Sequence, residues 1–131
     1  MLFRSVANIL SGRNLKSKKD VDNFTRIGIK FLHSPFLLPD VNPVLERLNK
    51  AIDNNEKIFV WGDYDVDGIT STAIVVTALR KMGANFEYKV PHRMEDGYDI
   101  KVHSVDEAIR RKASLLMSVD CGIVEIGRAH V

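Results

Sequence analysis

The stretch that decides the fold runs from residue 58 to residue 68 and reads Ile-Phe-Val-Trp-Gly-Asp-Tyr-Asp-Val-Asp-Gly. Its first four residues are large and apolar without interruption, which is typical of a strand buried on both faces of a parallel sheet. The acidic turn that follows, residues 62–68, carries carboxylates at three alternating positions. Such charges repel one another and lose hydration when buried, so the turn is stable mainly when it faces a cation.

Strand-like and helix-like segments alternate from Lys57 onward. Strands are expected at 57–61, 86–90 and 114–119, and helices at 70–82 and 104–112, the second opening with the capping pair Ser104 and Glu107. This order predicts an α/β fold: a Rossmann-like βαβαβ unit with a parallel sheet and right-handed crossovers.

Helical and irregular structure is expected before this unit. Val21, Phe24, Ile27 and Phe31 recur at helical spacing, and a further helix is expected to open at Asn42. We therefore divide the chain into a helical N-terminal lead-in, residues 1–54, the sheet-forming part, residues 55–124, and a tail, residues 125–131.

Acidic residues follow two of the expected strands. The acidic turn comes after the first strand, and Asp120 comes after the third. Ligands of parallel sheets bind outside the carboxyl ends of the strands. If the first and third strands are neighbours, in the order 2-1-3, Asp120 converges with Asp63, Asp65 and Asp67. A hard divalent metal ion is the obvious ligand for such a group.

Other interpretations explain the acidic turn less well. An EF-hand loop needs a bidentate Glu where this chain has Ile74, and no Gly-Lys-Ser/Thr follows the turn as in a P-loop. The phosphatases of the haloacid dehalogenase type are closer, because Asp65 and Asp67 match their nucleophile and acid. Simple helix capping is a minority explanation, since Thr70 and Ser71 are available to cap the next helix.

Composition limits the function classes. The chain has 131 residues, of which 45% are hydrophobic and 27% charged, and this predicts one globular domain. No apolar run is long enough for a membrane span, and a single cysteine, Cys121, fits the cytoplasm. Residues 1–60 carry ten Lys or Arg against six Asp or Glu, which suits a polyanionic substrate, although a solvated face is the simpler interpretation.

Three ordered motifs resemble one known family. Residues 58–73 closely resemble the first motif of the DHH phosphoesterases, in the form found in RecJ-type exonucleases specific for single-stranded DNA. Residues 90–98 are similar to the segment that follows in that subgroup, and residues 118–123 to the family's second motif. Three motifs in order are far more specific than one short match.

The resemblance implies a two-metal site that hydrolyses phosphodiesters with Mn²⁺ or Mg²⁺. By position it implies that Asp65, Asp67 and Asp120 are catalytic metal ligands, that Asp63 is a further ligand, and that Arg93 binds a substrate phosphate. The implied parent enzyme is a monomer without membrane contact that digests single-stranded DNA from the 5′ end, in DNA repair and recombination. Two alternatives stay open: a DHH phosphodiesterase for short oligonucleotides or cyclic dinucleotides, and a non-catalytic metal-binding module.

The chain also departs from the family. Asp99 stands where these exonucleases commonly have Gly, and the sequence contains no Asp-His-His triplet. We therefore expect an inactive N-terminal fragment of such an exonuclease. Residues 125–131 back-translate into a string that reads like a sequencing adapter. We interpret them as a non-native tail, and sequencing the genomic locus tests this.

Overall fold

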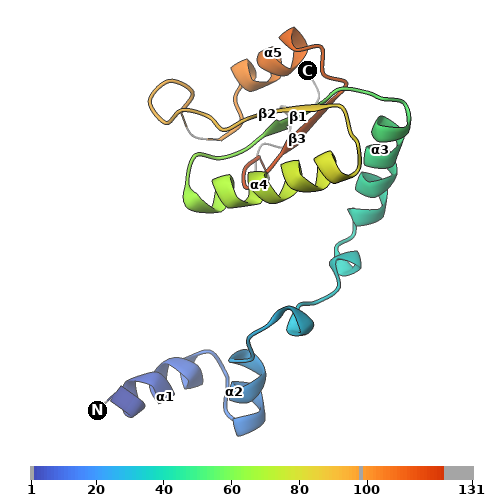
Figure 1. Ribbon diagram of the computed structural model, residues 1–131. Coiled ribbons are helices and arrows are strands. Elements are labelled where there is room, and N and C mark those ends of the chain that lie inside the picture. Colours follow the sequence, from blue (N-terminus) through green and yellow to red (C-terminus); the bar gives the residue numbers. More distant parts are fainter. Residues whose placement is uncertain (1, 98, 123–131) are drawn as a thin grey trace. The chain divides into compact units, whose positions relative to one another are not determined.

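The computed structural model describes residues 2–97 and 99–122, which belong to two compact units divided between Val41 and Asn42. The first unit contains two helices and two 3-10 turns: α1 (Leu2–Gly12), α2 (Lys18–Phe24), η1 (Ile29–Phe31) and η2 (Pro35–Leu37) (Figure 1). Ser17 caps α2, since its hydroxyl accepts the Asp20 N–H at 3.1 Å. The helical and irregular N-terminal segment expected from the sequence is therefore confirmed.

Two further sequence-based expectations concern the tail and membrane-spanning helices. The expected tail, residues 125–131, lies outside the described residues. Among the residues that are described, none of the helices combines the length and the apolar character needed to cross a membrane.

A three-stranded parallel sheet forms the centre of the second unit. Its order is β2-β1-β3, with β1 (Ile58–Trp61) between β2 (Phe86–Lys89) and β3 (Leu115–Ser118). Trp61, the last residue of β1, lies opposite Lys89 on one side and Ser118 on the other. The α/β fold and the strand order 2-1-3 are both confirmed, so the carboxyl ends of β1 and β3 lie side by side.

Both faces of β1 are covered by helices, as its uninterrupted apolar sequence predicts. Ile58 and Val60 pack with Ala51 of α3 (Val41–Asp53) and with Leu79 of α4 (Val66–Lys81). The alternate residues, Phe59 and Trp61, pack on the other face. There they meet α5 (Val102–Arg110), which covers the sheet on the side opposite α4 (Figure 1). The result is three layers in which all four residues of β1 are fully buried.

Helix α4 begins four residues earlier than the sequence indicated. It starts at Val66 because Asp65 caps it, accepting the Gly68 N–H at 2.9 Å. Thr70, an expected capping residue, lies inside the helix, and its hydroxyl donates to the Val66 carbonyl at 2.8 Å. The prediction of the helix start was wrong, and the acidic turn runs directly into the helix.

The starts of α3 and α5 also differ from the predictions. Asn42 lies within α3 and is not its cap. Helix α5 begins at Val102, so Ser104 is its third residue and accepts the Lys101 N–H at 3.2 Å. The expected pairing of Ser104 with Glu107 was wrong, because Glu107 forms ion pairs with Lys89 and Arg111.

Candidate metal centre

The acidic turn is fastened to the sheet at the carboxyl end of β1. The Gly62 N–H donates to the Lys89 carbonyl at 2.9 Å, which continues the pairing of β1 with β2. Asp63 comes next and is only 3% exposed, and its Oδ1 accepts the Tyr64 N–H at 2.7 Å. A buried carboxylate is thus presented by backbone on a rigid element, which is how proteins hold metal ligands in place.

Gly68 allows the turn to close on itself. A Cβ at this position would lie 2.5 Å from both the Cβ and the backbone oxygen of Asp63. Real side chains do not approach that closely, so only glycine lets the first turn of α4 pack against Asp63. The absence of a side chain at Gly68 therefore permits this close approach to Asp63.

Three of the predicted aspartates converge. Asp63, Asp65 and Asp120 each offer a carboxylate oxygen, and these three atoms lie within 4.8 Å of one another. Asp120 reaches the group from the end of β3 with a φ of 62°, a left-handed conformation that aspartate tolerates better than most residues. The neighbouring positions of β1 and β3 bring the two motifs to one place.

Asp67 is placed differently. It belongs to the first turn of α4, is exposed, and is not part of the three-carboxylate group found among the described residues. The charge of Asp67 nevertheless affects the three-carboxylate group. The pKa of Asp120 is raised above its usual value by partial loss of hydration, and further by the charges of Asp65, Asp67 and Asp63.

The donor set fits a hard divalent cation. Carboxylate oxygens are the ligands that Mg²⁺ and Mn²⁺ prefer. A bound cation would offset the mutual repulsion that adds to the effect of lost hydration on the Asp120 pKa. One of the three carboxylates is buried and two are exposed, so the group is open to solvent and to a substrate on one side. The arrangement suits a metal with free coordination positions.

We expect Asp120→Asn to stabilise the metal-free chain and weaken its metal binding. A carboxylate whose folded pKa is raised opposes folding once it ionises, so the gain in Tm should be present in EDTA at pH 7. It should vanish below the usual carboxyl pKa range, where Asp120 is protonated in both states. Mn²⁺ should reverse the order of the two Tm values, because only the wild type gains from tight binding.

Differential scanning fluorimetry at pH 7 and at a pH below the usual carboxyl pKa range, with and without Mn²⁺, checks this expectation. The matched control is Asp106→Asn, which removes the same charge from an exposed position on α5. If Asp120→Asn had a lower Tm than the wild type in EDTA at pH 7, an unfavourable Asp120 charge in the metal-free fold would be contradicted.

Arg93 lies beside the acidic turn. Its guanidinium carbon is 5.6 Å from the centre of the Tyr64 ring, and Tyr64 stands between Asp63 and Asp65 in the chain. Arg93 itself is exposed, so its charge is open to an incoming anion. The stacking of a guanidinium on an aromatic face fixes the side chain without neutralising it.

Asp99 has a structural role that the sequence did not reveal. Its φ is 67°, a conformation that glycine adopts freely and aspartate tolerates. Its Oδ1 accepts the N–H groups of Ile100 and Gly122, both at 2.8 Å. Asp99 thereby ties the segment before α5 to the turn that carries Asp120. The signal available in the sequence was an aspartate directly after a Gly-Tyr pair, which is a turn residue as much as a charge.

Cys121 is a packing residue in this structure. Its thiol lies 3.8 Å from the Gly62 carbonyl oxygen. Burial raises the pKa of the thiol to about 11, and the charge of Asp99 adds to the effect. Because the thiolate is the nucleophilic form, the raised pKa lowers the reactivity expected of this thiol at neutral pH.

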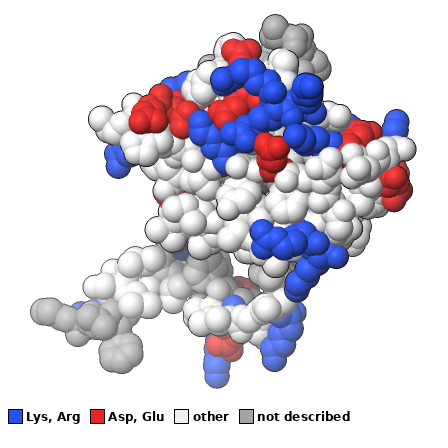
Figure 2. Space-filling model, turned by 45° about the horizontal axis from the view of Figure 1, so that its top comes forward, with Lys and Arg blue, Asp and Glu red and all other residues white. Residues whose placement is uncertain are grey.

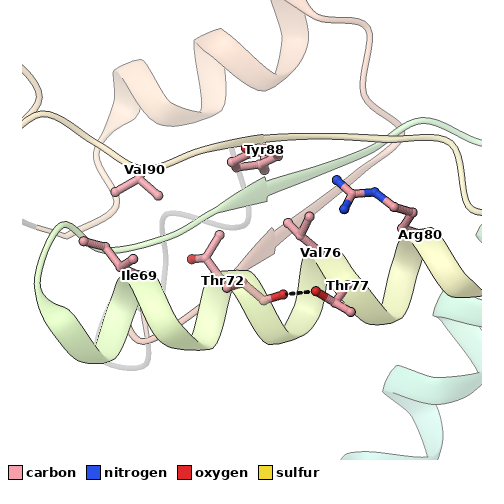
Figure 3. Close-up of a pocket in the computed structure, with 8 residues that line it drawn as sticks. Ile69, Thr72, Val76, Thr77, Arg80, Tyr88 and Val90 are labelled. Carbon is pink, nitrogen blue, oxygen red and sulfur yellow. Dashed lines mark hydrogen bonds between the residues drawn. The ribbon is translucent and has the colours of Figure 1, made fainter.

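A groove of about 320 Å³ runs between α4 and β2 (Figure 3). Ile69 and Val76 of α4 and Tyr88 of β2 line it, with Arg80 at one end. Its lining contains no carboxylate. The groove therefore offers no carboxylate ligand for a metal ion.

Comparison with known proteins identifies the family of the chain. Residues 57–130 match the family described as the DHH family, N-terminal domain. The chain belongs to the DHH family. It is 30% identical over 126 residues to the single-stranded-DNA-specific exonuclease RecJ of Bacillus subtilis. This alignment covers 96% of this chain and 16% of the RecJ protein. The chain is 45% identical over 87 residues to RecJ of Escherichia coli, covering 66% of this chain and 15% of that one.

Solved structures of RecJ match the fold. RecJ from Thermus thermophilus in complex with Mn²⁺ has a TM-score of 0.61 and 28% identity, over 91% of this chain and 15% of that structure. An exonuclease RecJ bound to manganese has a TM-score of 0.61 and 39% identity, over 66% of this chain and 23% of that structure. This DHH chain spans about 16% of the length of a RecJ protein it matches.

Proposed function

We propose that this DHH chain supplies metal ligands to an enzyme that hydrolyses phosphodiester bonds in single-stranded DNA, from the 5′ end, during DNA repair and recombination. The observation that carries the proposal is the convergence of Asp63, Asp65 and Asp120 within 4.8 Å at the carboxyl edge of the sheet. A bound Mn²⁺ or Mg²⁺ would supply the positive charge that polarises a phosphate and lowers the pKa of an attacking water.

Each residue of the site has a proposed role. Asp63, Asp65 and Asp120 hold one cation through carboxylate oxygens. Asp67 is the carboxylate available to a second cation, since its charge already acts on Asp120. Arg93 binds a substrate phosphate, for which a planar guanidinium is well suited.

The choice of DNA as substrate rests on the relatives. The matching proteins from Bacillus subtilis and Escherichia coli are both described as single-stranded-DNA-specific exonucleases. The two similar solved structures are both of RecJ with manganese. These likenesses support the RecJ-type reaction over the hydrolysis of cyclic dinucleotides.

Mn²⁺ binding to the chain tests the proposal without requiring activity. We expect saturable binding, followed by the electron paramagnetic resonance signal of free Mn²⁺, that Asp65→Asn weakens at least about tenfold. Asp106→Asn is the control and should bind Mn²⁺ like the wild type. The proposal fails if the wild type binds no Mn²⁺, or if Asp65→Asn binds as well as Asp106→Asn.

The substrate is tested by fluorescence anisotropy with a 5′-phosphorylated single-stranded oligonucleotide. We expect binding that depends on Mn²⁺ and that Arg93→Ala weakens. We expect no hydrolysis by the chain alone, because its sequence contains no Asp-His-His triplet to complete the family's ligand set. Preference for a cyclic dinucleotide would favour the first alternative, and Mn²⁺ binding without any nucleotide binding would favour a metal-binding module.

A further inference from the structure

A chain of alternating charges crosses the face of the sheet that α5 covers. Each member contacts the next at 3.0 Å or less, in the order Lys57, Glu87, Arg111, Glu107, Lys89 and Asp96. Figure 2, which brings the α5 side forward, shows basic and acidic groups intermingled on the upper part of the molecule. This series of ion pairs starts at Lys57, directly before β1, and ends at Asp96 in the loop that follows β2.

Lys89 is held in place by several contacts, and its carbonyl accepts the N–H of Gly62 at the start of the acidic turn. Its Nζ donates to Asp96 Oδ1 at 2.8 Å and to Glu107 Oε2 at 3.0 Å. The same Nζ lies 5.1 Å from the centre of the buried Trp61 ring. An ammonium with two carboxylates and one aromatic face around it has little freedom to move.

Asp96 uses both of its carboxylate oxygens. While Oδ1 accepts from Lys89, Oδ2 accepts the His92 N–H at 2.7 Å. The Asp96 N–H donates in return to the His92 carbonyl at 2.8 Å. The Asp96 side chain is only 13% exposed. These bonds close the loop from His92 to Asp96 and anchor it to β2.

Arg93 lies inside that closed loop, next to His92. The guanidinium stacks over Tyr64 of the acidic turn at 5.6 Å. A surface loop without such anchors would leave a long arginine side chain to sample many positions, and ordering it on binding would cost conformational entropy. The loop anchored by Asp96 and Lys89 limits that loss before a substrate arrives.

We propose that Asp96, held by Lys89, is a positioning residue that sets Arg93 beside the metal-binding turn for its phosphate contact. The part concerning phosphate rests on the proposed function of Arg93. The placement of Arg93 over Tyr64 does not, and it is measured separately.

Nuclear magnetic resonance of the full chain measures that placement. We expect nuclear Overhauser contacts between the Arg93 Hδ protons and the Tyr64 ring in the wild type. Asp96→Ala should abolish them, while Asp106→Ala, which removes an exposed charge from α5, should leave them unchanged. Lys89→Met keeps the length of the side chain and should also abolish them. Contacts that persist in a folded Asp96→Ala chain would overturn the proposal.

Oligonucleotide binding distinguishes positioning from general destabilisation. With the 5′-phosphorylated oligonucleotide and Mn²⁺, Asp96→Ala and Arg93→Ala should each raise Kd about tenfold, the effect of losing one charge-assisted hydrogen bond. The double variant should bind no more weakly than either single variant, because both remove the same contact. Asp96→Asn can keep the His92 bond and should bind with intermediate affinity.

The outcomes separate the two proposals. Additive losses in the double variant would overturn the positioning role while leaving the substrate-binding role of Arg93 intact. If the wild-type chain bound no oligonucleotide, the proposed function would fail, and the contacts between Arg93 and Tyr64 would still decide the positioning role. Mn²⁺ affinity should stay unchanged in Asp96→Ala, since Asp96 is not among the three converging carboxylates.

Discussion

Gly68→Ala is expected to weaken Mn²⁺ binding at least about tenfold and to destabilise the fold by about 1–3 kcal/mol. The new Cβ would meet the Cβ and backbone oxygen of Asp63 at 2.5 Å. Neither of these atoms is the far end of a flexible side chain, so either the start of α4 or the turn must move. Asp63 and Asp65 would then no longer be held in their present geometry.

Gly12→Ala is the matched control for this experiment. Gly12 ends α1, and a Cβ there would meet nothing within 4 Å. Alanine favours helix over glycine by up to about 1 kcal/mol, so this variant should be as stable as the wild type or slightly more so, with unchanged Mn²⁺ affinity. Calorimetric titration with Mn²⁺ and thermal unfolding measure both effects. Wild-type affinity in Gly68→Ala would show that the close approach does not constrain the turn.

Phe59→Ala is expected to cost about 3–5 kcal/mol and so to unfold much of the sheet unit. The Phe59 side chain is fully buried and packs with Ala108 of α5. Its ring lies edge-on to the Trp61 ring, with 6.2 Å between the ring centres. Native domains of this size are stable by only about 5–15 kcal/mol, and small ones lie at the low end. The loss of one central aromatic ring is therefore a large part of the total.

The control is Phe36→Ala in the first unit, which removes the same ring from a side chain that is 62% exposed. A substitution at such a position should change stability by less than about 0.5 kcal/mol. Circular dichroism during thermal unfolding should show Phe59→Ala with a Tm more than about 10 °C below wild type, or with no cooperative transition. Equal Tm values for the two variants would contradict the central place of β1 in the core.

Much of the fold was predictable because β1 and its neighbours carry unambiguous local signals. Four apolar residues in a row can be stable only where both faces are covered, and the structure covers them with α3 and α4 on one side and α5 on the other. The helix starts were less predictable. Asp65, Thr70 and Ser71 are all good capping residues, and in the structure Asp65 is the one that caps α4.

The candidate site was predictable as a set of aspartates and not as a geometry. The sequence places Asp63, Asp65 and Asp67 in one turn and Asp120 after another strand. Which of them meet depends on the start of α4, which takes Asp67 into its first turn, and on the left-handed backbone of Asp120. Neither feature leaves a clear trace in a single sequence.

The sequence by itself determined the order of the elements, the burial of β1 on both faces, and the gathering of acidic residues at the carboxyl edge of the sheet. These depend on hydrophobic periodicity and chain direction, which are local properties of the chain. Only the tertiary structure decided that Asp63, Asp65 and Asp120 share one space, and that Lys89 and Asp96 anchor the loop of Arg93. Those contacts join residues of different elements, and their distances are fixed by packing.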